Sequence, residues 1–162
     1  MPTPFRRQKK QLKATNHVSM ARDMLHDVVR NALIDDGWII THDPFEMSPY
    51  DPAWEIDLGA EKLLVAEKES EKIAVEIKGF RATSFGYEFH AVLGQYMSYR
   101  SGLKRIEAER KLFLAVPLDI YETEFQREGV VNAIADYDVH LVEVVQSFDT
   151  KLNVESSSCS TN

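Results

Sequence analysis

Three residues in the first half of the chain, Asp57, Glu76 and Lys78, have the types and spacing that metal-assisted phosphodiester hydrolysis requires. Glu76 and Lys78 are two positions apart in a segment that alternates apolar and polar residues, so in a β-strand both side chains leave the same face. Asp57 ends a shorter strand-like segment, and its carboxylate meets that of Glu76 if the two strands are neighbours. Two converging carboxylates attract a divalent cation such as Mg²⁺ or Mn²⁺, which prefers oxygen ligands.

A cation held by Asp57 and Glu76 would activate water for attack on a phosphate. Lys78, beside the cation, would orient or deprotonate that water and stabilise the charge that develops on the phosphoryl oxygens. The pattern alone is loose, because many half-exposed strands carry Glu and Lys as a solvated face. Apolar runs flank this segment and favour the catalytic interpretation, since buried Lys and Glu are rare without a reason.

Further polar residues could join this site from two predicted helices. Gln95 could position water, and Tyr99, four residues later on the same helix face, is either an accessory residue or a core aromatic. An acidic residue from the first helix could also take part, and the sequence does not choose between Asp23 and Asp27. His26, on that helix, is either an accessory residue or a polar partner at the helix surface.

The elements that must position these residues follow from hydrophobic periodicity. Apolar residues at helical spacing predict an amphipathic helix over 18–33, which Gly37 terminates. A proline-rich loop is expected at 44–52 and a hairpin turn at 68–71. The other expected elements are strands over 38–41, 54–57, 61–67, 72–80, 111–116 and 139–145, and helices over 88–103, 119–125 and 129–136. The order α-β-β-β-β-α-β-α-β predicts an α/β fold with a central mixed sheet flanked by helices.

Composition indicates one ordinary globular domain. The chain has 162 residues and a formal charge of −7, with one cysteine, Cys159. We expect a domain over 18–146, a flexible basic arm over 1–17 and a flexible Ser/Thr-rich tail over 147–162. A single cysteine forms no disulfide framework, and the sequence has neither a membrane-spanning stretch nor a signal-peptide pattern. A cytoplasmic location without a membrane partner is therefore expected.

Five runs of the sequence carry a resemblance to a known family, at residues 25–33, 36–44, 57–63, 73–78 and 93–96. They resemble the XisH family, the fdxN-element excision controlling factors of cyanobacteria. The resemblance implies a restriction-endonuclease-like fold of the PD-(D/E)xK superfamily, with Asp57, Glu76 and Lys78 on the nuclease positions. The pair Gln95 and Tyr99 is similar to an additional motif of the RecB-like branch of that superfamily. One departure is Ile56, where the superfamily motif usually has proline.

The same resemblance implies partners and a biological role. XisH proteins act in the excision of a DNA element by a site-specific recombinase, usually together with a small XisI-type protein. DNA is therefore an expected partner, and the chain could also form a homo-oligomer. Three functions remain: a divalent-metal-dependent endonuclease, a catalytically silent accessory factor with a nuclease fold that binds DNA or a recombinase, and an interaction module that acts through an XisI-type partner.

Overall fold

The computed structural model describes residues 21–48, 50–64, 69–81 and 84–145. The predicted arm and tail lie outside these residues. The described chain opens with a helix that ends at residue 35, and Gly37 follows with a positive φ of 88°, as expected for a helix end. The later elements are β1 (Ile39–His42), β2 (Phe45–Met47), β3 (Trp54–Ile56), β4 (Leu58–Leu64), β5 (Glu69–Ile77), α2 (Phe85–Ile106), β6 (Lys111–Pro117), α3 (Leu118–Thr123), the 3₁₀ turn η1 (Glu124–Gln126), α4 (Glu128–Asp136) and β7 (Leu141–Val144).

The central sheet has five strands in the order β1-β4-β5-β6-β7. Strands β1, β4 and β5 pair antiparallel, whereas β5, β6 and β7 pair parallel. Helix α2 forms the crossover between the parallel neighbours β5 and β6. The predicted mixed sheet flanked by helices is therefore confirmed, and β5 occupies its middle.

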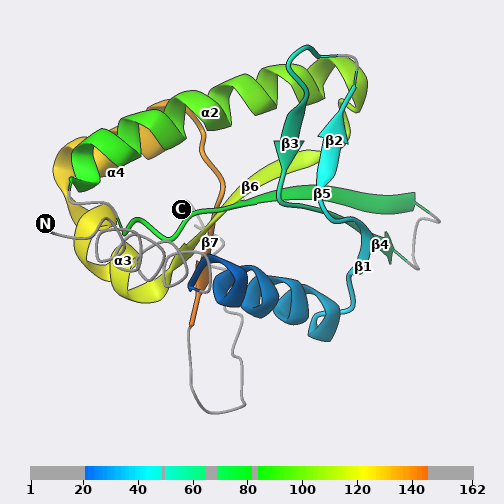
Figure 1. The fold of residues 1–162 in the computed structure, drawn as a ribbon, viewed down its shortest axis with the longest axis horizontal. Helices are drawn as coiled ribbons and strands as arrows, with labels where there is room; N and C mark the ends of the chain where they lie inside the picture. Colours follow the sequence, from blue (N-terminus) through cyan, green and yellow to red (C-terminus); the bar gives the residue numbers. More distant parts are fainter. Residues whose placement is uncertain (1–20, 49, 65–68, 82–83, 146–162) are drawn as a thin grey trace, which may run out of the picture.

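Helices cover both faces of the sheet (Figure 1). On one face, Leu25 and Val29 of the first helix belong to the same buried cluster as Val75. On the other face, Ala74 is buried in a second cluster that includes the α2 residue Tyr96. The alternation of β5 thus directs Ile73, Val75 and Ile77 towards the first helix and Ala74 and Glu76 towards α2. Within the described residues, no helix is long and apolar enough to cross a membrane.

Strands β2 and β3 form a separate antiparallel ribbon, which rises from the sheet towards the C-terminal part of α2 (Figure 1). The prediction of a loop over 44–52 is wrong at β2, because Phe45 and Met47 alternate with an exposed residue and are buried in the core. A Cβ atom at Gly102 of α2 would lie 3.3 Å from Met47 Sδ and 3.2 Å from Tyr50 Cε2. Glycine therefore allows the helix to approach the ribbon closely.

Other element boundaries differ from the predictions by a few residues. Strand β4 starts at Leu58, three residues before the expected 61–67 strand, and β5 starts at Glu69, so most of the predicted turn is strand. Strand β5 ends at Ile77, and Phe80 adopts a positive φ of 47°. The predicted helix over 88–103 extends to Phe85–Ile106, with the Ser84 hydroxyl accepting a hydrogen bond from the Tyr87 N–H at its start.

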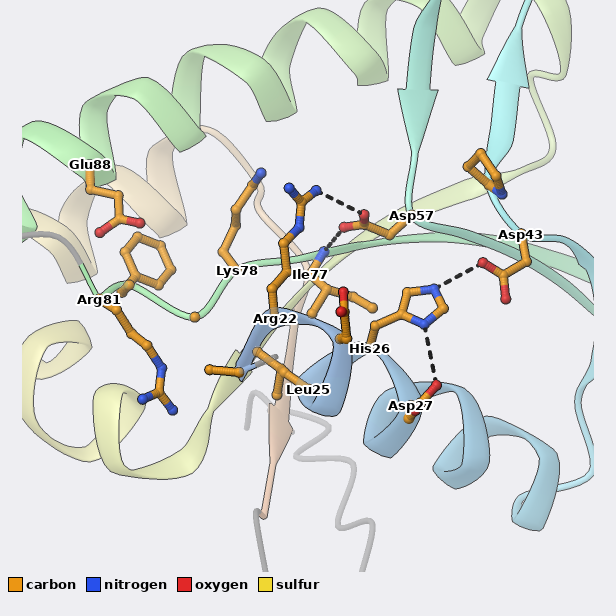
Figure 2. Close-up of a pocket in the computed structure, with 15 residues that line it drawn as sticks. Arg22, Leu25, His26, Asp27, Asp43, Asp57, Ile77, Lys78, Arg81 and Glu88 are labelled. Carbon is orange, nitrogen blue, oxygen red and sulfur yellow. Dashed lines mark hydrogen bonds and ion pairs between the residues drawn. The ribbon is translucent and has the colours of Figure 1, made fainter. Parts of the chain in front are cut away.

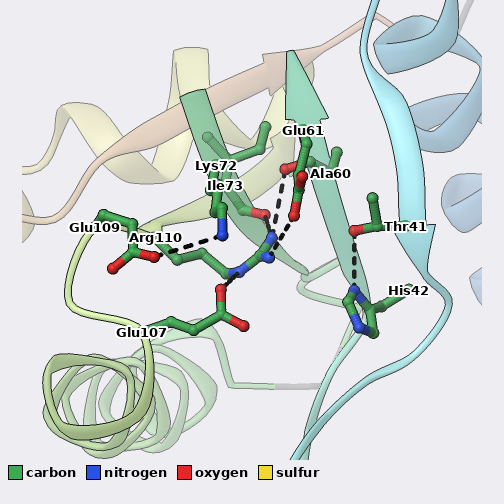
Figure 3. A network of polar contacts seen from close by, with 9 residues as sticks. All are labelled: Thr41, His42, Ala60, Glu61, Lys72, Ile73, Glu107, Glu109 and Arg110. Atoms are coloured by element: carbon green, nitrogen blue, oxygen red, sulfur yellow. Dashed lines mark hydrogen bonds and ion pairs between the residues drawn. The ribbon is translucent and has the colours of Figure 1, made fainter. Parts of the chain in front are cut away.

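A buried arginine stabilises the end of the sheet far from Glu76 (Figure 3). Arg110 is only 4% exposed and donates a hydrogen bond of 2.8 Å to the Ile73 carbonyl. Its guanidinium also forms ion pairs with Glu61 at 3.2 Å and Glu107 at 2.7 Å and lies over the Phe45 ring. These partners compensate the buried charge and join β4, β5 and the segment before β6.

Candidate metal centre

Asp57 reaches the end of β5 through strand β4. Its neighbour Leu58 pairs with Val75 in the antiparallel ladder, which places Asp57 opposite the last residues of β5. Asp57 Oδ2 accepts a hydrogen bond of 2.7 Å from the backbone N–H of Ile77. From the sequence, Asp57 was expected to meet Glu76 if the strand ending at Asp57 lay next to the Glu76 strand. In the structure β3 pairs with β2 instead, and the link from β3 into β4 carries Asp57 to its place.

Glu76 and Lys78 form an ion pair on the α2 side of β5. Lys78 Nζ lies 2.8 Å from Glu76 Oε1, and the Glu76 residue is only 3% exposed. The pKa of Glu76 is raised from its ordinary value of 4.5 to about 7, and burial is the largest cause. Within this net shift the Asp57 carboxylate also raises the pKa, whereas the Lys78 ammonium lowers it. The two carboxylates are therefore close enough to repel each other, and one lysine does not fully compensate them.

Helix α2 places Gln95 and Tyr99 near the carboxylates. Gln95 Nε2 donates a hydrogen bond of 2.6 Å to the Tyr99 hydroxyl. Tyr99 is 8% exposed within the hydrophobic core. Its pKa is raised by burial first and then by the negative charge of Glu76, with a smaller effect of Asp57. Tyr99 is thus a core aromatic whose hydroxyl also lies in the electrostatic field of the two acids.

A cleft of about 670 Å³ opens beside this cluster, between the first helix and the end of β5 (Figure 2). Asp57 and Lys78 line its wall, together with Arg22 and Arg81. Arg22 Nη2 lies 3.7 Å from Asp57 Oδ1, which is the carboxylate oxygen that Ile77 does not use. The cleft gives a ligand access to Asp57 and Lys78.

Among the described residues, His26 and Asp27, the candidate accessory residues of the first helix, form a cluster with Asp43 rather than with Asp57 or Glu76. His26 Nε2 lies 2.9 Å from Asp43 Oδ1, and His26 Nδ1 lies 3.8 Å from Asp27 Oδ1 (Figure 2). All three residues line the cleft, as does Asp23. Within the part of the chain that the structure describes, no group of three or more His, Cys, Asp or Glu side chains could hold a metal ion. The structure therefore brings Asp57 and Glu76 together without a third acid.

The donor set nevertheless fits a hard divalent cation. Mg²⁺ in proteins is commonly bound by one or two carboxylates, with water completing its octahedral shell. Asp57 Oδ1 lies 3.7 Å from the exposed guanidinium of Arg22. Glu76 Oε1 pairs with Lys78 Nζ, and the Glu76 carboxylate also accepts a hydrogen bond from the Asp57 backbone N–H. Asp57 and Glu76 are accordingly the residues that would hold Mg²⁺ or Mn²⁺.

Sequence reasoning did not single out Arg22, Arg81 or Asp43, all of which line the cleft. Arg22 stands four residues before His26, and this helical spacing placed both on one face of the first helix. That spacing was the only available signal. The position of Arg22 beside Asp57 depends on how the first helix packs on the sheet, and a local sequence pattern does not specify that packing.

These features define a mixed α/β protein with two carboxylates and a lysine at the end of its central strand, beside an open cleft. The family model described as XisH protein matches residues 19–152 of the chain. The chain belongs to the XisH family.

Two solved structures are similar to this chain. The crystal structure of an XisH family protein from Nostoc punctiforme PCC 73102 is 41% identical, covers 74% of this chain and 88% of its own, and has a TM-score of 0.64. The crystal structure of an fdxN element excision controlling factor protein from Anabaena variabilis is 39% identical, covers 75% of this chain and 90% of its own, and has a TM-score of 0.67. No curated protein matches the chain.

Proposed function

We propose that this chain is a DNA-processing protein with a divalent-metal-dependent nuclease site of the PD-(D/E)xK type, in a restriction-endonuclease-like fold. The observation that carries the proposal is the convergence of Asp57, Glu76 and Lys78 at one end of the central strand. Lys78 contacts Glu76, and the Asp57 charge raises the pKa of Glu76. A structural role explains this cluster poorly, because a buried carboxylate beside a second acid destabilises the fold.

Each residue has a separate task in this proposal. Asp57 and Glu76 hold Mg²⁺ or Mn²⁺, and the hydrogen bond from Ile77 N–H fixes the direction of the Asp57 carboxylate. Such a cation, when bound, lowers the pKa of water and stabilises charge on a phosphate. Lys78 donates hydrogen bonds to the attacking water and to the phosphoryl oxygens. Gln95 orients water through its amide, while its contact with Tyr99 holds the amide in place.

The biological setting follows from the relatives. The similar protein of Anabaena variabilis is described as an fdxN element excision controlling factor. We infer that this chain likewise takes part in excision of a DNA element, with DNA, a site-specific recombinase and a small XisI-type protein as partners. The nuclease site would then nick or trim DNA during that process.

A plasmid assay tests the activity. Purified protein is incubated with supercoiled plasmid and Mg²⁺, Mn²⁺ or EDTA, and nicked product is measured on a gel. We expect nicking only with a divalent cation, and its loss in Asp57→Asn, Glu76→Gln and Lys78→Ala. Gln95→Ala should reduce the rate less, because an amide positions water without carrying charge.

Lys72→Ala is the matched control for Lys78→Ala. Like Lys78, which directly follows β5, Lys72 is a partly exposed lysine in an ion pair, at 3.5 Å from Glu109, but it lies within β5 and towards its opposite end. Nicking that persists in Glu76→Gln would assign the activity to a contaminating enzyme. Equal loss in Lys72→Ala and Lys78→Ala would contradict a specific role for Lys78.

A second function is favoured by the charge of the cleft. Its lining residues include more acids than bases, which weakens direct binding of phosphates. In this alternative the chain is a catalytically silent accessory factor that acts through an XisI-type partner. Binding of metal and DNA by the wild-type protein, with no nicking in any metal, would support this alternative and contradict the nuclease proposal.

A further inference from the structure

Arg22 lies at the cleft with its guanidinium directed at Asp57. The distance from Arg22 Nη2 to Asp57 Oδ1 is 3.7 Å, and 75% of the arginine side chain is exposed. An ion pair this long and this exposed is weak and exchanges readily for water or another ligand. Arg22 is therefore a loosely held cation on one of the two carboxylates that would bind metal.

The Asp57 carboxylate does not depend on Arg22 for its orientation. Its other oxygen, Oδ2, accepts a hydrogen bond of 2.7 Å from the backbone N–H of Ile77. That N–H belongs to Ile77, the last residue of β5, which is buried like the four residues before it. Departure of Arg22 consequently leaves Asp57 in place, with Oδ1 open to a different cation.

The charges around the cleft make the metal-free state a poor binder of phosphate. Three cationic side chains line it, and five acidic ones surround them: Arg22, Lys78 and Arg81 against Asp23, Asp27, Asp43, Asp57 and Glu88. Moreover, Arg22 and Lys78 are each paired with a carboxylate. A divalent cation at Asp57 and Glu76 offsets the excess of two negative charges among these side chains, because it supplies two positive charges, and it removes the attraction between Asp57 and Arg22.

We propose that Arg22 is a phosphate-binding residue that Asp57 retains as a counter-ion until a divalent cation binds. The cation replaces the guanidinium as the partner of Asp57, and Arg22 then binds a phosphate of the nucleic-acid backbone. This inference rests on the proposed metal site. It makes DNA binding in the cleft depend on metal. It also means that Arg22 weakens binding of the divalent cation and strengthens binding of DNA.

Arg22 suits this role better than the other cations of the cleft. Lys78 is only 21% exposed and is held by Glu76 at 2.8 Å, so it stays with the reacting groups. The guanidinium of Arg22 is planar and can bind two phosphate oxygens at once. In Figure 2 the side chains of Arg22 and Lys78 extend in the same direction, and both line the cleft, where a phosphate would meet them together.

The test measures two affinities in Arg22→Ala. Mn²⁺ binding is measured by calorimetry, and binding of a short labelled duplex with a phosphorothioate backbone is measured by anisotropy, with and without Mn²⁺. We expect Mn²⁺ to bind about 2- to 5-fold more tightly, the range for loss of a competing exposed ion pair. The duplex should bind more weakly in Mn²⁺, with a salt slope smaller by about 0.9.

Arg30→Ala is the matched control, because Arg30 is on the same helix and pairs at 3.4 Å with Asp43 instead of Asp57. It should leave Mn²⁺ affinity unchanged, and Arg22→Lys should restore part of the duplex affinity. Wild-type Mn²⁺ binding with no gain in Arg22→Ala overturns the role of Arg22 and leaves the proposed metal site standing. Absence of Mn²⁺ binding in the wild type overturns both.

Discussion

Replacing Glu76 with glutamine tests the buried carboxylate through the stability of the fold. Glutamine has nearly the same shape as a protonated glutamate but cannot ionise. The pKa of Glu76 is 4.5 ordinarily and about 7 in the folded protein. Each pKa unit corresponds to about 1.4 kcal/mol, so ionising Glu76 in the folded state costs about 3 kcal/mol. Since the residue is only 3% exposed, solvent screening reduces this figure little.

The sign of the effect follows from proton binding. Below about pH 4.5, Glu76 is protonated in both the folded and the unfolded chain. Between 4.5 and about 7 the folded state retains a proton that the unfolded state has released, so the free energy of unfolding falls as pH rises. Above about pH 7, Glu76 is ionised in both states, and the stability that the retained proton gave the folded state is lost. Glu76→Gln avoids this loss, and we expect it to be about 3 kcal/mol more stable than the wild type at about pH 8.

Urea unfolding of both proteins at about pH 5 and about pH 8 measures the effect. The difference between variant and wild type should grow by about 3 kcal/mol over this interval. Glu46→Gln, at an exposed position of β2, is the control for removing a carboxylate from the surface. A difference between Glu76→Gln and wild type that does not vary with pH would refute the assignment of Glu76 as a buried acid with a raised pKa.

Three further predictions concern metal binding and architecture. Millimolar Mn²⁺ should raise the melting temperature more at about pH 8 than at about pH 6, because protonation of Glu76 competes with the metal, and Glu76→Ala should abolish the increase. Val75→Asp should unfold the domain by burying a charge among apolar side chains, whereas Lys78→Ala should remain folded by circular dichroism; similar losses in both would contradict the assignment of strand faces. Arg110→Ala should cost about 3–5 kcal/mol in urea unfolding, since it leaves Glu61 and the Ile73 carbonyl without their buried partner, and a loss below about 1 kcal/mol would contradict that role.

The parts of the fold that the sequence predicted are those with a strong local pattern. The period-two alternation around Val75 and Glu76 identified the strand and the side that each residue faces. Gly37 marked the end of the first helix, where the structure has a positive φ. These signals need only neighbouring residues, because backbone conformation and burial periodicity are local properties.

The parts that the sequence did not predict depend on contacts between distant segments. Strand β2 was missed because the nearby prolines suggested a loop, whereas Phe45 and Met47 form a strand by packing against α2 and pairing with β3. The hydrogen bond between Asp57 and Ile77 could be predicted only on the condition that the segment carrying Asp57 lies beside the Glu76 strand. The contact between Arg22 and Asp57 depends on how the first helix packs on the sheet, which the helical spacing of Arg22 and His26 does not specify.

The pairing of β4 with β5 has a consequence for how the chain folds. It is the most local pairing of the central sheet, running from Leu64 opposite Glu69 to Leu58 opposite Val75. Local hairpins form early, because they close short loops at little entropic cost. We therefore expect the nascent hairpin to bring Asp57 and Glu76 together before α2 covers them, while water still screens their repulsion. We expect the charge of Glu76 to speed unfolding more than it slows refolding, so the pH dependence should appear mainly in the unfolding arm of a chevron plot.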